Sequence, residues 1–362
     1  MSLAVGPPVE GFPRDTDAIE ALVLAGGDRL RERMTRIELH LERVSAAAGA
    51  PLAAYATATI NAGGKRLRPL LVVLAAESAP PGPEGAAAEE CLVRAAAAVE
   101  LVHSATLVHD DVIDEASLRR GRPTVVAEGG RQIAIATGDL LFSRAFAELA
   151  RNGDPTQLQA LSDASSALAA GELLQREDAY SPHVTIERYL RRCELKTAAL
   201  FEAACRLGAL VAAGGAGVAG VAGVAGVGST DLADSFGAFA RRIGLAFQIL
   251  DDVLDVSGPV ERTGKARGTD LLDGTVTLPL ILARERDGEL AGIDLATLRG
   301  AAGPAGAEEL CDRILATGAL EQARERALAL VAEAKAALPA AGGTGSRELL
   351  EQVADAVVER YR

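Results

Sequence analysis

Aromatic residues are scarce in this chain of 362 residues, where they make up 3% of the sequence and tryptophan is absent. A pocket walled by aromatic rings, which can stabilise a positively charged group, is therefore not expected. Runs of alternating β-branched residues are also lacking. Alanine-rich apolar segments at helical spacing dominate instead, so the composition predicts an all-α fold.

Cysteine is also rare, and none of the four cysteines forms a Cys-x-x-Cys pair or a metal-binding spacing. Neither a disulfide framework nor a zinc site is therefore indicated. We expect reduced core residues of a cytoplasmic protein at these positions, which are Cys91, Cys193, Cys205 and Cys311.

Positive charge is in deficit, since the formal net charge is -13 at pH 7. This balance argues against binding to nucleic acid and against electrostatic docking on anionic membranes. Residues 1–31 contain no apolar run long enough for a secretory signal. Residues 210–229 carry no charge, but seven of these twenty residues are glycine, so a transmembrane helix is not expected.

The apolar periodicity indicates one helical domain over residues 31–362, after a poorly ordered lead-in at residues 1–30. Within this domain, we interpret the Gly/Ala/Val-rich residues 212–229 as a low-complexity loop between two helices. A helix is predicted to cover about Thr185 to Ala213.

An Asp-Asp-x-x-Asp pattern occurs twice, 141 residues apart, at Asp110, Asp111 and Asp114 and again at Asp251, Asp252 and Asp255. Positions i, i+1 and i+4 of a helix fall within an arc of roughly 100°, so each copy should present its carboxylates on one face. Either copy alone could be a solvated acidic face. Because both follow apolar runs and like charges repel, the pair favours a site for hard divalent cations, Mg²⁺ above all, that grips a polyphosphate.

Basic residues that could complete such a site lie near glycines or follow the first acidic motif. Lys65 and Arg68 belong to a turn at residues 63–69, and Arg119 and Arg120 come a few residues after the first motif. In isolation, such residues are most simply solvated surface charges. Beside two acidic helices, they can clamp a diphosphate through charge-assisted hydrogen bonds.

Further candidates lie on the predicted helices and in one loop. His103 stands two helical turns before the first motif on the same face, where a buried core histidine is the simpler alternative. Lys196 and Thr197 are adjacent in mid-helix, and a buried lysine there would need an anionic partner. Gln248 precedes the second motif, and Lys265 lies in a glycine-flanked loop suited to a lid over phosphates.

Five segments, in this order, resemble the trans-polyprenyl diphosphate synthases, most of all the long-chain members: GGKRLRP (63–69), HSATLVHDDVIDEASLRRGRPT (103–124), KT (196–197), FQILDDVLD (247–255) and GKARGTDL (264–271). The resemblance implies an isoprenoid synthase fold, with about ten core helices around a central active-site cavity. It also implies a homodimeric prenyltransferase that joins an allylic diphosphate and isopentenyl diphosphate, head to tail.

The same resemblance assigns roles to the candidate residues. The six aspartates would hold about three Mg²⁺ ions per active site, with Asp251 a direct ligand and Asp252 and Asp255 acting partly through water. Isopentenyl diphosphate would be bound by Lys65, Arg68, His103 and Arg120. The allylic diphosphate would contact Arg119, Lys196 and Lys265. The allylic carbocation would be steadied next to Lys196, by Thr197 and Gln248.

The helical turns that lead into the first motif carry no aromatic plug, and their candidate chain-length residues are Leu101, Val102, Ala105 and Thr106. An isoprene unit is comparable in length to one helical turn, about 5.4 Å. We therefore expect a long product of about C30 to C50, with geranylgeranyl diphosphate (C20) as the alternative. Phe142 and Phe146, on a neighbouring helix, are candidates for the floor of the tunnel.

Two other functions fit part of the pattern. A class I terpene cyclase shares the metal chemistry, but such enzymes usually replace the second acidic motif and line the pocket with aromatic side chains. A subunit of a heteromeric synthase would share the fold, and non-catalytic subunits tend to lose the aspartates. All six aspartates are present here, which favours a catalytic chain, alone or with a partner subunit.

Overall fold

The computed structural model describes residues 15–80, 82, 84–214, 229–258, 267–299, 303–339 and 344–359. Helices make up nearly all regular structure in these ranges. The two strands, β1 (Leu118–Arg119) and β2 (Arg122–Pro123), form one short antiparallel pair. The predicted all-α fold is therefore confirmed.

The first half of the chain folds into helices joined by short turns. They are α1 (Asp15–Ala25), α2 (Gly27–Ala46), α3 (Leu52–Asn61), α4 (Leu67–Ser78), α5 (Ala86–Ile113), α6 (Val125–Ala150) and α7 (Pro155–Asp178). Polar side chains cap the N-termini of two of the long helices, α6 and α7. Thr124 accepts the backbone N–H of Ala127 at 3.2 Å, and Asp154 accepts that of Thr156 at 2.9 Å, which satisfies donors left free at a helix start.

The second half contains more short elements. They are α8 (Ile186–Cys193), the π-helical turn η1 (Glu194–Ala198), α9 (Ala199–Ala212), α10 (Ser229–Ser257), α12 (Thr269–Leu272), α13 (Leu278–Arg286), α14 (Gly288–Ala291), the 3₁₀ turn η2 (Leu295–Arg299), α15 (Gly303–Ala316), α16 (Ala319–Ala337) and α17 (Thr344–Glu359).

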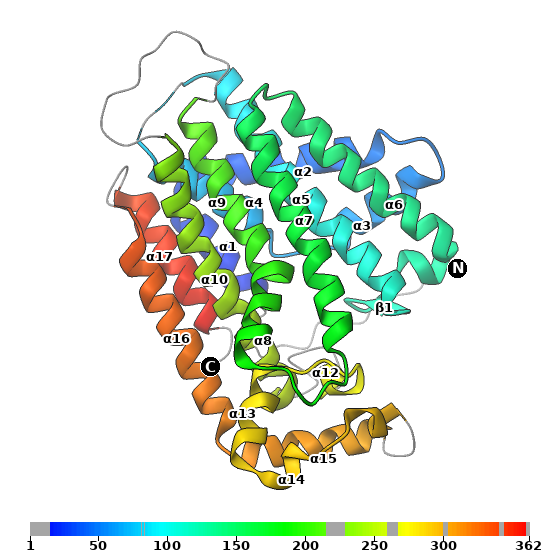
Figure 1. Ribbon diagram of the computed structural model, residues 1–362. Coiled ribbons are helices and arrows are strands. Elements are labelled where there is room, and N and C mark those ends of the chain that lie inside the picture. The colour runs from blue at the N-terminus through cyan, green and yellow to red at the C-terminus, as the bar shows by residue number, and fades with distance from the viewer. Residues whose placement is uncertain are drawn as a thin grey trace.

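Helix α5 lies near the middle of the bundle (Figure 1) and packs against α2, α4, α6 and α9. Its residues 95–99 are alanines and a valine with no solvent exposure, and such small side chains let neighbouring helices approach closely. Among the described residues, α5 alone is apolar and long enough to cross a membrane, but 72% of its apolar window is buried inside the protein. Packing in the core accounts for its composition.

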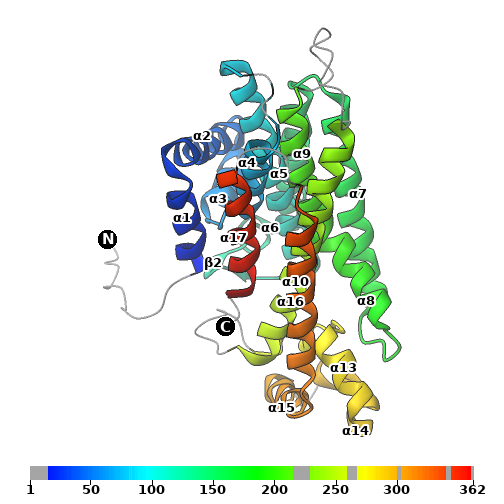
Figure 2. The ribbon, with the colours of Figure 1, turned by 90° about the vertical axis from the view of Figure 1, so that its left-hand side faces the viewer.

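Both acidic motifs lie toward the C-terminal ends of their helices, α5 and α10. Helix α10 contacts α12, α13 and α15. Figures 1 and 2 show α13, α14 and α15 gathered at one end of the molecule, the lower end in both views. The second motif therefore lies at the end of α10 that faces this part of the molecule. Strand β1, which follows the first motif, also lies in the lower half of Figure 1.

Three segments differ from the expectations, or lie outside the described residues. Helices α1 and α2 occupy much of the predicted lead-in because Ile19, Leu22 and Leu30 are buried in the core, whereas residues 1–14 are not described. The helix predicted over about Thr185 to Ala213 is present as α8, η1 and α9, but its residues 194–198 form a π-helical turn. Of the predicted loop at 212–229, residues 215–228 also lie outside the described ranges.

Candidate active site

The first acidic motif ends α5, and its three carboxylates have different surroundings. Burial raises the pKa of Asp110 to about 6, against the pull of nearby Lys196. Asp111 is buried and accepts a hydrogen bond from Nε of Arg119 at 2.8 Å. Asp114, half exposed at the helix end, accepts one from Arg176 at 2.5 Å. Two carboxylates of the motif are therefore paired with arginines.

The second motif divides its carboxylates between solvent and core. Asp251 is exposed, whereas the Asp252 side chain is buried. The two carboxylate oxygens of Asp252 accept hydrogen bonds from the Tyr189 hydroxyl at 2.7 Å and from the Gln248 amide at 2.8 Å. Asp255 accepts the backbone N–H of Asp270 at 3.2 Å. Burial, reinforced by the nearby Asp270 charge, raises the pKa of both Asp252 and Asp255.

The donor set fits Mg²⁺, which prefers carboxylate oxygens and usually binds through one or two of them together with substrate phosphates. Burial raises the pKa of Asp110, so a nearby cation would favour its ionised form. Among the described residues, no three acidic, histidine or cysteine side chains converge as a ready-made metal site. Phosphate oxygens of a substrate would therefore complete the coordination.

Lys196 and Thr197 lie on the π-helical turn η1, an element frequently found at functional sites. Two glycines of neighbouring helices make room for this turn. A Cβ atom on Gly171 of α7 would lie 2.6 Å from the backbone nitrogen of Lys196, and one on Gly244 of α10 would lie 2.7 Å from Cα of Ala198. The backbone of η1 therefore sits closer to α7 and α10 than any larger residue would allow.

Lys196 donates to Glu172 of α7 at 2.5 Å, and Glu172 also accepts Nε of Arg176, one turn further on, at 3.1 Å. Arg176 in turn reaches Asp114. This ion-pair network connects η1, α7 and the first motif. Sequence analysis missed Glu172 and Arg176, although their i, i+4 spacing of opposite charges on a helix was a visible signal.

Basic side chains surround His103. Burial, together with the charges of Arg68, Arg120 and Arg119, lowers the pKa of His103 well below its usual value, so the ring is neutral at pH 7. Burial also lowers the pKa of Arg68 to about 10, and its guanidinium carbon lies 4.7 Å from the centre of the Phe201 ring. These groups form a region of concentrated positive charge, as the predicted diphosphate clamp requires.

A cavity of about 220 Å³ opens beside this group. His103, Asp111, Arg119 and Arg120 all line it, together with Gly63 of the basic turn. The structure therefore brings one carboxylate of the first motif to the same cavity as three of the predicted basic or histidine residues.

The turn that carries Lys65 is held by its neighbour Arg66. Arg66 adopts a left-handed backbone conformation, φ 50°, just before α4. Its guanidinium binds Glu38 at 2.6 Å, Glu100 at 2.8 Å and the carbonyl oxygen of Ile60 at 2.8 Å. Arg66 thus fixes the turn, whereas Lys65 is half-buried within it. The buried carboxylate of Glu100 is a second supporting group that sequence analysis missed.

Three of the predicted chain-length residues, Leu101, Val102 and Ala105, have no exposed surface, and Thr106 is half-buried. The α5 residues that line the 220 Å³ cavity, among them Ser104 and Leu107, occupy other positions around the helix. None of the four chain-length candidates lines that cavity. The 220 Å³ cavity and the predicted chain-length residues therefore lie on different faces of α5.

Phe142 lies beside His109, with 5.8 Å between the ring centres. His109 directly precedes Asp110, so Phe142 stands level with the first motif. A position this close to the metal-binding end does not suit the floor of a long tunnel. Phe146, one helical turn further along α6, is half-buried and packs against the core.

Lys265, predicted to contact the allylic diphosphate, lies outside the described residues. The neighbouring backbone is described from Arg267 onward. There the N–H of Gly268 donates to the carbonyl oxygen of Asp255 at 2.9 Å. The start of the segment after this loop is thus attached to the second motif.

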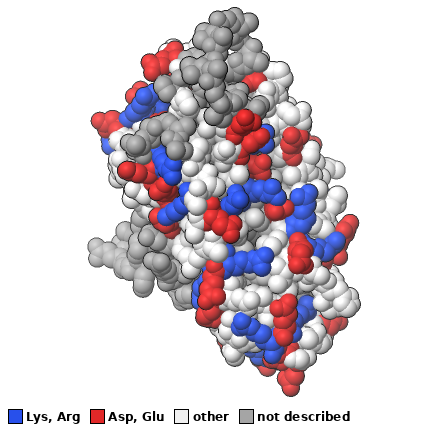
Figure 3. All heavy atoms as spheres, turned by 60° about the vertical axis from the view of Figure 1, so that its left-hand side comes forward, with Lys and Arg blue, Asp and Glu red and all other residues white. Residues whose placement is uncertain are grey.

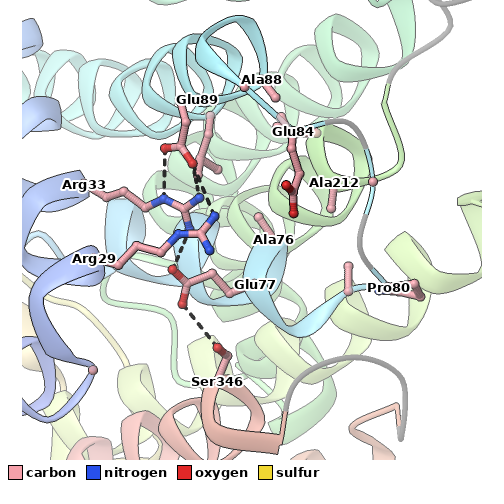
Figure 4. A pocket seen from close by; sticks show the side chains of 16 residues that line it. Arg29, Arg33, Ala76, Glu77, Pro80, Glu84, Ala88, Glu89, Ala212 and Ser346 are labelled. Atoms are coloured by element: carbon pink, nitrogen blue, oxygen red, sulfur yellow. Dashed lines mark hydrogen bonds and ion pairs between the residues drawn. The ribbon is translucent and has the colours of Figure 1, made fainter.

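A second cavity, of about 600 Å³, lies far from the acidic motifs, between the ends of α2, α4, α5, α9 and α17 (Figure 4). Its α5 residues are more than 15 positions before Asp110, which corresponds to over about 25 Å along the helix. Arg33 is buried there and paired with Glu77 and Glu89, while Ser346 donates to Glu77 at 3.2 Å. The ion pairs among Arg29, Arg33, Glu77 and Glu89 suit a structural role.

Acidic and basic side chains alternate on the face shown in Figure 3, with no broad basic area. This mixture agrees with the net charge of -13. The clustered positive charge around His103 is thus a local reversal within an acidic protein, of the kind that an anionic substrate needs.

A family model described as polyprenyl synthetase matches residues 50–301. The chain belongs to the polyprenyl synthetase family. This polyprenyl synthetase is 39% identical over 254 residues to heptaprenyl diphosphate synthase component 2 of Geobacillus stearothermophilus, covering 70% of this chain and 73% of that protein. It is 36% identical over 304 residues to octaprenyl diphosphate synthase of Escherichia coli (strain K12), covering 84% and 88%.

A crystal structure of a polyprenyl synthase from Caulobacter crescentus CB15, complexed with calcium and isoprenyl diphosphate, shares the fold with a TM-score of 0.81. It is 33% identical to this polyprenyl synthetase and covers 97% of this chain and 99% of its own. The resemblance to long-chain trans-polyprenyl diphosphate synthases, the isoprenoid synthase fold and the prenyltransferase class, all predicted from the sequence, are confirmed.

Proposed function

We propose that this polyprenyl synthetase uses Mg²⁺ to condense an allylic diphosphate with isopentenyl diphosphate, head to tail, into a long trans-polyprenyl diphosphate. The observation that carries the proposal is a contact between the two halves of the site. Arg119 donates to Asp111 at 2.8 Å, and both residues line the cavity beside His103. An acidic metal-binding face and a basic phosphate pocket thus share a wall, so two diphosphates can lie side by side.

Six aspartates are predicted to hold about three Mg²⁺ ions per active site. Of these, Asp110, Asp111, Asp114, Asp251 and Asp255 are the proposed ligands, whereas both oxygens of Asp252 already accept hydrogen bonds from Tyr189 and Gln248. When bound, the metal neutralises charge that develops on the departing diphosphate. Asp111 and Asp114 are paired with arginines in the structure. Those arginines would then turn to the phosphate oxygens, which replaces one anionic partner with another.

The chain's own residues would bind and orient the allylic substrate. Lys196, Arg119 and Lys265 would hold its diphosphate while the allylic C–O bond breaks and the bonding electrons leave with the diphosphate oxygen. Thr197 and Gln248 lie next to Lys196, with Oγ of Thr197 2.6 Å from Oε1 of Gln248. Their oxygen atoms would stabilise the carbocation that remains.

Isopentenyl diphosphate would occupy the pocket of Lys65, Arg68, His103 and Arg120. Its double bond would attack the carbocation, so that one C–C bond forms. The adjacent carbon then loses a proton, for which the released pyrophosphate is the base. Since His103 is neutral, it can donate a hydrogen bond to a phosphate oxygen without adding charge.

A product of about C30 to C50 is supported by the small or aliphatic side chains of Leu101, Val102, Ala105 and Thr106, which leave several helical turns without an aromatic plug. Similarity to heptaprenyl and octaprenyl synthases points the same way. Geranylgeranyl diphosphate (C20) remains the alternative product.

A homodimer in the cytoplasm is the proposed assembly and location. One relative is named as component 2 of a heptaprenyl synthase, so a heteromeric enzyme with this chain as the catalytic subunit is the alternative assembly.

The purified full chain, supplied with Mg²⁺, an allylic diphosphate and labelled isopentenyl diphosphate, tests these proposals. Mass spectrometry of the dephosphorylated products should show prenyl alcohols of about C30 to C50. Predominant farnesyl product would refute the open tunnel. A chain that stays silent until a second protein is added would refute the homo-oligomeric enzyme.

A further inference from the structure

Four side chains from α8, η1 and α10 form one continuous hydrogen-bond chain behind the proposed reaction centre. The Tyr189 hydroxyl donates to Asp252 at 2.7 Å, and the Gln248 amide nitrogen donates to the other Asp252 oxygen at 2.8 Å. The Thr197 hydroxyl donates to the Gln248 amide oxygen at 2.6 Å. Tyr189 has no exposed surface and Asp252 is 3% exposed.

The order of donors in this chain is fixed by the chemistry of its members. When Oδ1 of Asp252 carries no proton, it can only accept from Gln248, because the amide oxygen would be repelled by that oxygen if Gln248 were flipped. This orientation is the same whether or not the oxygen facing Tyr189 carries a proton. The amide oxygen of Gln248 must then face Thr197, and the Thr197 hydroxyl hydrogen must point at it.

The Thr197 oxygen is thereby left with lone pairs that do not face Gln248. If the Thr197 hydroxyl were free to rotate, it could turn its hydrogen toward the carbocation and repel it. An oxygen locked as an acceptor needs no reorganisation when positive charge develops, which is the condition for effective electrostatic stabilisation.

We infer that Tyr189 and Asp252 are positioning residues that fix the acceptor orientation of Thr197 through Gln248. Asp252 then serves this hydrogen-bond network rather than binding Mg²⁺. The inference rests on the proposed prenyl transfer. Asp251, next to Asp252 but exposed, remains the metal-binding member of the pair. The second acidic motif thus divides its work between metal binding and orientation of the hydroxyl.

Tyr189→Phe removes one hydroxyl from this hydrogen-bond network and leaves the aromatic ring in place. We expect kcat to fall about tenfold, the rate effect of about 1.4 kcal/mol, with little change in either KM. The matched control is Tyr180→Phe, which removes the hydroxyl of a half-buried tyrosine outside this hydrogen-bond network. This variant should leave kcat unchanged. An unchanged kcat in a folded Tyr189→Phe enzyme would overturn the inference.

Asp252→Asn and Asp251→Asn separate orientation from metal binding. In the Asp252→Asn variant, the new amide can still accept from Gln248 while it donates to Tyr189. The rate should therefore fall less than in Asp252→Leu, and half-maximal activity should need the same Mg²⁺ concentration as in the wild type. Asp251→Asn should need at least about tenfold more Mg²⁺. A comparable increase for Asp252→Asn would show that Asp252 is a metal ligand.

Two further readouts keep the outcomes distinct. Thermal unfolding of each variant reports folding, and a loss of stability with a normal kcat would assign Tyr189 a structural role only. Pyrophosphate release by the wild-type chain tests the prenyl transfer itself, because its absence would refute the proposed function before any variant is compared.

Discussion

The ammonium group of Lys196 lies 2.5 Å from a carboxylate oxygen of Glu172. The lysine that was expected to meet a substrate diphosphate therefore has an anionic partner within the protein. Glu172 also raises the pKa of Asp110, which Lys196 lowers, so this one ion pair affects both the metal face and the phosphate site.

Glu172→Gln should strengthen binding of the allylic diphosphate, because Lys196 would no longer have to leave a carboxylate. We expect the KM for the allylic substrate to fall about two- to fivefold, in keeping with a partly exposed ion pair. Glu177→Gln is a suitable control, since Glu177 lies on the same helix but pairs with Arg188. Steady-state kinetics at saturating isopentenyl diphosphate would measure both, and a raised KM would contradict the prediction.

The rate at limiting Mg²⁺ should rise with pH through about 6, the pKa to which burial raises Asp110. Below that pH the carboxyl carries a proton, which a metal ion must displace before it can bind. Saturating Mg²⁺ should therefore move the acidic limb of the profile to lower pH. Rate profiles at two metal concentrations measure this shift, and superimposed acidic limbs would count against Asp110 as a ligand.

Gly171→Ala should damage the site through the backbone. Its Cβ would lie 2.6 Å from the backbone nitrogen of Lys196, which cannot move as the end of a flexible side chain can. We expect a loss of about 1–3 kcal/mol in the free energy of unfolding and a lower kcat. Gly288→Ala, where the added Cβ meets no atom within 4 Å, is the control. Denaturant unfolding would compare them, and equal stabilities would show that η1 can shift.

Ala105→Tyr should shorten the product, because a bulky ring one turn below Asp110 would block the path proposed for the growing chain. Leu107→Tyr provides the contrast, since Leu107 lines the diphosphate cavity. It should impair use of isopentenyl diphosphate without changing the product length. Mass spectrometry of the products distinguishes the two, and a folded Ala105→Tyr enzyme with unchanged product length would place the tunnel elsewhere.

Much of the site could be predicted from local patterns. Helical spacing predicted the shared face of each acidic motif, and clustered basic residues near glycines predicted the proposed phosphate clamp. The orientation of Asp252 could not be obtained in this way. Spacing within α10 does not reveal that Tyr189 of α8 will meet that carboxyl, because this contact depends on how distant segments pack.

The π-helical turn was missed for a similar reason. Residues 194–198 read as ordinary helix, and the cause of the irregularity lies partly in Gly171 and Gly244, which belong to other helices. Glu172 and Arg176 resembled a solvated ion pair on one helix surface. Only the packing of α7 against η1 shows that they reach Lys196 and Asp114.

Helix α5 separates the two jobs that a chain-elongating enzyme must perform. Residues such as Ser104 and Leu107 border the cavity proposed for the incoming five-carbon unit, while Ala105 and Leu101 are buried elsewhere in the core. Substitutions on one side can therefore alter how long the polymer grows while the unit added at each step stays the same. A family built on such a helix can diversify its products by changing a few side chains and keep a single catalytic apparatus.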